Sequence, residues 1–184
     1  MYKLRELERK DVAAINQWRN DEEIVETLGA PFRFINKEVD EKWFESYMQS
    51  RTNTIRCAIV TEDCDNILGL VTLADINFIN RSATLHLMIG KNSQNKGVGT
   101  FAVKTITKHA FLNYGLHRIE LSVLESNERA KHVYEKCGFQ KEGTLRHAVY
   151  KNGKFVDLNL MGCLRSDYDA VVRELNDDSN AVLK

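Results

Sequence analysis

The chain lacks a long apolar run and an excess of charge of either sign. In 184 residues no apolar stretch approaches the ~18 residues that a membrane span needs. Residues 1–6 contain no apolar segment of the kind found in signal peptides. Lys and Arg together number 26, and Asp and Glu also number 26, so the formal net charge is zero. This balance argues against binding to nucleic acid through bulk electrostatics. We therefore expect a cytoplasmic protein with neither a membrane nor a nucleic acid as partner.

The cysteines and histidines lack the spacings that bind metals. None of the four cysteines forms a Cys-x-x-Cys pair, and the five histidines contain no His-x-x-x-His. Cys57 and Cys163 lie in strand-like runs, which suits small buried apolar side chains. We predict no disulfide framework and no metal site.

What the chain does contain is typical of one globular domain. Hydrophobic residues make up 43% of the sequence and charged residues 28%, and the length is ample for one buried core. We expect residues 1–175 to form a single domain and residues 176–184 to be a polar C-terminal tail.

Apolar periodicity indicates a mixed α/β domain. Asp11, Asn36 and Asn127 are expected to cap helices. The turn at Asn152-Gly153 is a strong hairpin signal. Alternation predicts strands at 3–8, 55–60, 67–75, 83–89, 117–124, 145–150 and 155–164. A last helix is expected over residues 165–175. We expect one parallel strand pair, across the strand–helix–strand unit at the centre of the chain.

The most informative segment is the glycine-containing turn at residues 94–100. It follows the strand at 83–89 and opens a helical repeat, so its backbone N–H groups are suited to a phosphate or pyrophosphate. A P-loop would need a Lys directly after Gly99, and none is there. The turn does match the dinucleotide pattern G-x-G-x-x-A, with Glu120 about twenty residues on. Hairpins upstream replace the βαβ units of that fold, and Glu120 lies inside a strand.

Two motifs in order resemble those of the GCN5-related N-acetyltransferases (GNAT). Gln94-x-x-Gly97-x-Gly99 is similar to the family's pyrophosphate loop, and residues 127–139 are similar to its N-x-x-A-x-x-x-Y-x-x-x-G-F helix. The chain looks most like the branch of the spermidine N-acetyltransferases and the ribosomal-protein N-terminal acetyltransferases. The resemblance implies an α/β (α+β) GNAT fold: a central mixed, mostly antiparallel sheet, helices on both faces and a splayed central strand pair.

The resemblance also implies direct transfer of the acetyl group of acetyl-CoA to a primary amine. It assigns Tyr134 as the general acid for the leaving thiolate. For the amine itself, Glu41 and Asp75 are candidate substrate-binding carboxylates. The expected cofactor-binding residues are Leu87, Met88, Ile89, Gln94, Asn95, Lys96, Gly97, Val98, Gly99, Thr100, Asn127, Ala130 and Lys136.

The acceptor is left open between several amines. We favour a small molecule, and a polyamine such as spermidine or spermine ahead of others. Arg33 and Lys37 interrupt the acidic region that a polycation would need, so an amino-sugar nucleotide or a protein N-terminus such as that of a ribosomal protein is an alternative. A non-catalytic acetyl-CoA-binding domain is the contrasting class. A homo-oligomer is possible, as in many proteins that the chain resembles.

Overall fold

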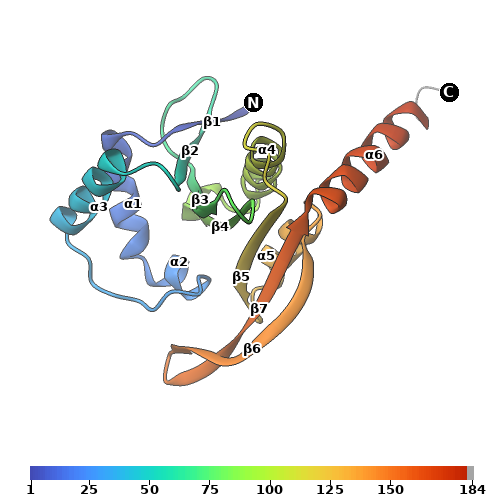
Figure 1. Ribbon diagram of the computed structural model, residues 1–184. Coiled ribbons are helices and arrows are strands. Elements are labelled where there is room, and N and C mark those ends of the chain that lie inside the picture. Colours follow the sequence, from blue (N-terminus) through green and yellow to red (C-terminus); the bar gives the residue numbers. More distant parts are fainter. Residues whose placement is uncertain (182–184) are drawn as a thin grey trace.

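The computed structural model describes residues 1–181, with side chains through residue 173. Its strands form one sheet in the order β1-β2-β3-β4-β5-β7-β6 (Figure 1). The strands are β1 (Tyr2–Glu6), β2 (Ile55–Thr61), β3 (Gly69–Asn77), β4 (Ser82–Ile89), β5 (Arg118–Leu124), β6 (Gln140–Lys151) and β7 (Lys154–Leu164). The α-helices are α1 (Val12–Arg19), α2 (Glu22–Glu26), α3 (Lys37–Gln49), α4 (Val98–Leu112), α5 (Glu128–Glu135) and α6 (Arg165–Ala181).

Both faces of the sheet are covered, so the molecule has two apolar cores. Alternate residues of β2 show this directly, because Ile59 packs into one core and Ala58 and Val60 pack into the other. Helices α1 and α3 cover the second face through residues such as Ile15 and Phe44. Helices α4 and α5 cover the first. This arrangement confirms the predicted GNAT fold class.

The central strand pair β4–β5 is parallel, as predicted, and it separates after a short stretch. The two strands pair through Ser82–Arg118, Ala83–Ile119 and Thr84–Glu120. Within the described chain no pairing continues beyond Thr84, so the C-terminal halves of β4 and β5 present free backbone groups to each other. The sheet thus has a built-in opening at its middle.

The helix boundaries show where local signals succeed and where they fail. Asn36 and Asn127 cap α3 and α5, because their side chains accept the backbone N–H of Val39 and Ala130 at 3.0 Å. Asp11 was expected to cap α1 but does not. Its carboxylate instead accepts two hydrogen bonds from Arg5, at 2.8 and 2.9 Å, and one from the Glu8 N–H.

Two further segments differ from the expectation. Helix α2 follows α1 closely and was not predicted, since five residues are too few for a periodic pattern. Helix α6 continues to Ala181, beyond the predicted end at residue 175, and residues 182–184 of the expected tail lie outside the described residues. In the described part of the chain no helix is both long and apolar enough to span a membrane.

Candidate active site

A cavity of about 630 Å³ occupies the opening between β4 and β5. Its walls come from seven parts of the chain: the end of α2 with the loop after it, β3, β4, the turn before α4, the start of α4, β5 and α5. The sheet opening therefore places the cavity where free strand edges, a helix N-terminus and the predicted motif helix meet.

The glycine turn forms one end of this cavity. Asn95 and Gly97 have positive φ angles of 60° and 78°, which turn the chain sharply before α4 begins at Val98. No side chain caps α4, so its first N–H groups are left for a ligand. Gln94 holds the turn against β4 by donating from Nε2 to the Ile89 carbonyl at 3.2 Å. The turn is thus a shaped anion site at a helix N-terminus.

The neighbouring wall is the free edge of β4. Leu87, Met88 and Ile89 all line the cavity, as the resemblance predicts for the strand that holds the pantetheine arm. Free N–H and C=O groups on such an edge can pair with the amides of an extended ligand.

The structure of helix α5 and the turn after it shows what each residue of the motif at 127–139 does. Asn127 caps the helix, and Ala130 and Tyr134 line the cavity. Gly138 ends the helix at a φ of 91°, and a Cβ there would lie 3.3 Å from Val171. Phe139 then packs against Tyr134 with ring centroids 5.9 Å apart. The motif therefore fixes the position of one cavity-facing phenol.

Tyr134 is 7% exposed and lines the cavity. The Thr107 hydroxyl is the sole described polar side-chain atom that is enclosed without a hydrogen-bond partner. Among the described residues no hydrogen bond is found for the Tyr134 hydroxyl, and the residue lines the cavity. Burial, helped by Cys137, raises the pKa of Tyr134 to about 12. The phenol is therefore protonated at neutral pH and can donate its proton.

Another wall of the cavity is the loop after α2, through Thr27, Leu28, Gly29 and Ala30. Lys151, at the end of β6, holds this loop. Its ammonium donates to the carbonyls of Val25, Leu28 and Ala30 at 2.6, 2.8 and 3.0 Å. Asn127 Nδ2 donates to the Thr27 carbonyl at 2.9 Å. We call residues 27–30 the acceptor wall, because the glycine turn and β4 are the walls expected to hold the donor.

The cavity has few ionisable groups. Among the described residues that line it, His86, Arg129 and Tyr134 are the ones that carry titratable side chains, and no Asp or Glu does. Glu41 lies outside, on α3, in an ion pair with Arg9. Asp75 lies at the bulge of β3 with a φ of 52° and acts on His86 by charge alone.

The two predicted lysines do not line the cavity. Lys96 and Lys136 are exposed, at the glycine turn and at the end of α5 respectively. The Tyr2 hydroxyl donates to the Lys96 carbonyl at 2.9 Å and so steadies the turn. The cofactor roles of both lysine side chains stay predictions. The other predicted cofactor-binding residues are gathered around the one cavity.

Comparison with known proteins identifies the family to which the residues of this cavity belong. The family model described as an acetyltransferase (GNAT) domain matches residues 2–140. That span contains the glycine turn and the whole motif helix. The chain belongs to the GNAT acetyltransferases. It is accordingly an acetyl-CoA-dependent N-acetyltransferase, with acetyl-CoA as cosubstrate.

Within GNAT the chain is similar to relatives of both predicted kinds. Spermidine N(1)-acetyltransferase of Vibrio cholerae is 32% identical over 177 residues, covering 90% of this chain and 94% of the relative. The Bacillus subtilis putative ribosomal N-acetyltransferase YdaF is 29% identical over 104 residues, covering 56% and 57%. Among solved structures, the Vibrio cholerae spermidine N-acetyltransferase in complex with CoA and spermine has a TM-score of 0.84 at 30% identity, covering 91% of this chain and 97% of the other.

Three parts of the GNAT site were missed in the sequence. The acceptor wall and its anchor Lys151 are more than 120 residues apart, so no local pattern links them. His86 interrupts the apolar run at residues 85–89 of β4. That interruption was a usable signal, because in an alternating strand it places a polar side chain on the face opposite Leu85 and Leu87.

Proposed function

We propose that this GNAT enzyme acetylates a polyamine such as spermidine or spermine. One observation carries the proposal: the similarity to the Vibrio cholerae spermidine N-acetyltransferase covers more than nine tenths of both chains, and the structure of that relative holds CoA and spermine. The acceptor end of the cavity is compatible with an alkyl amine, since Ile24, Leu28 and Met88 supply apolar surface there.

The lining also limits how a polycation can bind. Because no described Asp or Glu lines the cavity, distal ammonium groups must find their carboxylates at its mouth. Helix α2 carries Glu22 and Glu26 on its exposed surface, next to the lining residues Ile24 and Thr27. We infer that a polyamine places its reacting end inside and its remaining charges near this helix.

For the reaction we propose that the turn at residues 94–100 binds the pyrophosphate and that β4 binds the pantetheine arm. The amine attacks the thioester carbonyl carbon, and the carbon–sulfur bond breaks as the thiolate leaves. Tyr134 supplies the proton to that thiolate. The position of Tyr134 in the cavity lining and its protonated state at neutral pH support this role.

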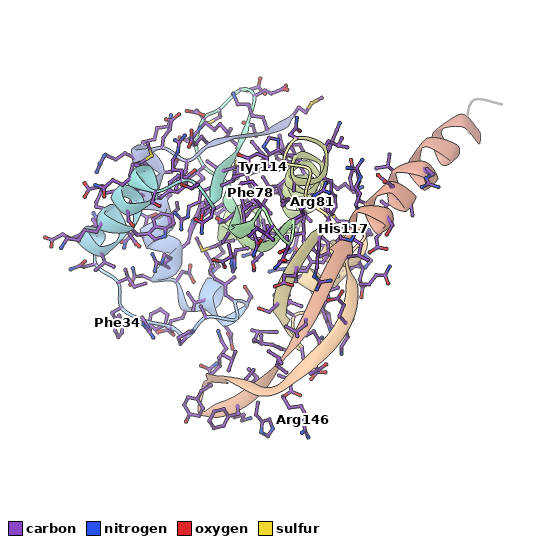
Figure 2. The ribbon with its side chains drawn as sticks, viewed as in Figure 1. Phe34, Phe78, Arg81, Tyr114, His117 and Arg146 are labelled. Atoms are coloured by element: carbon purple, nitrogen blue, oxygen red, sulfur yellow. The ribbon has the colours of Figure 1, made fainter. Side chains whose placement is uncertain are left out.

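A second candidate acceptor is an amino-sugar nucleotide. Arg129 lines the cavity, Arg33 is exposed on the loop between α2 and α3, and Lys37 is exposed at the first position of α3. Figure 2 shows that Phe34 of this loop and Arg146 of β6 point outward from the molecule. Cations in these places would suit the phosphates of a nucleotide sugar better than they suit a polycation.

The deciding experiment measures release of the CoA thiol with spermidine, spermine, an amino-sugar nucleotide and an N-terminal peptide. We expect the two polyamines to give the highest kcat/KM. If the nucleotide sugar or the peptide gave a higher kcat/KM, that compound would be the acceptor in place of a polyamine. Binding of acetyl-CoA without turnover of any amine would favour the non-catalytic class. We also propose a cytoplasmic location, which the four free thiols support.

A further inference from the structure

Acetylation requires a group that removes a proton from the acceptor. An alkyl amine has a pKa near ~10, so at neutral pH it arrives as an ammonium without a free electron pair. The cavity lining offers few groups for this task. Arg129 stays protonated in proteins, and Tyr134 is already protonated and serves the thiolate.

We propose that His86 is the catalytic base that takes the proton of the acceptor ammonium. The proposal rests on an amine acceptor, as given under the proposed function, but not on which amine it is. His86 is the remaining titratable group that lines the described cavity.

The alternation of β4 places the imidazole on the acceptor side of the sheet. Leu85 is buried in the core under α4, and Leu87 packs against the same core. His86 lies between them and therefore points to the other face, together with Met88. The position is one residue, about 3.3 Å along the strand, from the backbone of Leu87 that is expected to hold the thioester. An amine at the imidazole would thus be close to the carbonyl that it attacks.

Neighbouring strands set the charge around the imidazole. The register places Arg56 of β2 opposite Thr72 of β3, and Thr72 opposite His86 of β4. These three side chains form one row on one face of the sheet. Arg56 is fixed there by stacking over the Trp43 and Tyr47 rings, at 4.7 Å from each centroid. A fixed cation in the same row disfavours a second positive charge.

The net effect is a neutral base at physiological pH. His86 is exposed at the cavity, where partial desolvation lowers the pKa of its imidazole, Asp75 raises it in part, and Arg56 lowers it further. The imidazole therefore has its acceptor nitrogen free at pH 7. Asp75 lies on the exposed bulge of β3, where it can stabilise the imidazolium after the proton has moved.

The proton balance closes with these groups. One ammonium proton moves to the His86 imidazole and from there to solvent. The freed electron pair forms the nitrogen–carbon bond, and the carbon–sulfur bond breaks. The thiolate takes the Tyr134 proton, and a second proton lost from the acylated nitrogen restores the phenol. The products are the acetamide, the CoA thiol and one proton released to solvent.

The test compares His86→Gln and His86→Ala with a matched control, His109→Gln, which changes an exposed histidine on α4. The expected result is a loss of kcat/KM for the amine of ~10²-fold or more at pH 7 in both His86 variants. The KM for acetyl-CoA should be unchanged. In wild type, kcat/KM should fall at acidic pH through a group with a pKa below 6.5, and this limb should vanish in His86→Gln. The control should keep wild-type rates and profile.

A second measurement decides the proposal even if no amine in the panel is turned over. NMR titration of the wild-type imidazoles, with His86 assigned by its missing signal in His86→Gln, should give a pKa below 6.5. An imidazole that is cationic at pH 7 would overturn the assignment. The assignment would also be overturned if His86→Gln kept the kcat/KM of the wild type and the same fall of kcat/KM at acidic pH. If the wild type turned over none of the amines, the proposed function would be rejected instead.

Discussion

The strongest structural prediction concerns Lys151, whose ammonium fastens the acceptor wall. In Figure 1 the β6–β7 hairpin extends toward α2, and Lys151 makes its three bonds there. Lys151→Met keeps most of the aliphatic length and removes all three donors. We expect the wall to loosen while the glycine turn, which Gln94 and Tyr2 hold, stays in place.

The magnitude follows from the hydrogen bonds with a discount for water. Hydrogen bonds to a charged group contribute ~1.5–3 kcal/mol each, so three independent ones would sum to ~4.5–9 kcal/mol. Burial lowers the pKa of Lys151, which shows that the ammonium loses hydration here, and its bond to Ala30 is exposed. We therefore expect a net anchoring free energy of ~1–3 kcal/mol. This corresponds to a ~5- to 150-fold increase in the population of the opened loop.

Two measurements check this prediction. Hydrogen exchange should accelerate by that factor at the amides of residues 27–30, and the KM for the amine should rise while the KM for acetyl-CoA is unchanged. Lys154→Met is the matched control, because Lys154 is the exposed partner of Lys151 across the hairpin turn. Unchanged exchange and an unchanged amine KM in Lys151→Met would refute the reasoning.

Four other outcomes are expected. Tyr134→Phe should lower kcat by ~10²-fold with an unchanged KM for acetyl-CoA, and wild-type kcat would remove the general-acid role. Asp75→Asn should move the acidic limb of kcat/KM to lower pH, because Asp75 raises the pKa of His86; an upward shift would contradict that coupling. CoA at ~100 times its Kd should stabilise the fold by ~2.7 kcal/mol, visible as a higher Tm, and an unchanged Tm would contradict binding. Tyr150 and Phe155 are 59% and 61% exposed on the β6–β7 hairpin, so we expect the protein to self-associate through these two rings. Light scattering should then report a mass above 21.2 kDa for the wild type and a lower mass for the double variant Tyr150→Ser/Phe155→Ser. A wild-type mass of 21.2 kDa would exclude self-association through this patch.

The donor side of the site was predictable because its determinants are local. The glycine turn and its helix are adjacent in the chain, and the Asn127 cap, Tyr134 and Gly138 fall within one short helix and its end. Helix capping, helical spacing and a positive φ angle each depend on residues that are close together in the sequence. These signals located the donor side of the cavity lining in advance.

The acceptor side was not predictable because distant contacts determine it. Asp11 looks like a helix cap, but the guanidinium of Arg5 takes its carboxylate. Glu41, predicted as a partner for an amine, lies on α3 in an ion pair with Arg9. The short helix α2 has no periodicity of its own, and Lys151 holds it from the far end of the chain. In each case a tertiary contact outweighs the local preference.

The Lys151 anchor also has a consequence for the order of folding. It joins residues that are 121 to 126 positions apart, so the acceptor wall is complete only after the last hairpin has folded. The span that matches the GNAT model ends at residue 140, before this anchor. A nascent chain of that length already contains the residues of the donor side, but not the lysine that fixes the wall. The acceptor wall therefore takes its final form late in synthesis, after the residues of the donor side are already present.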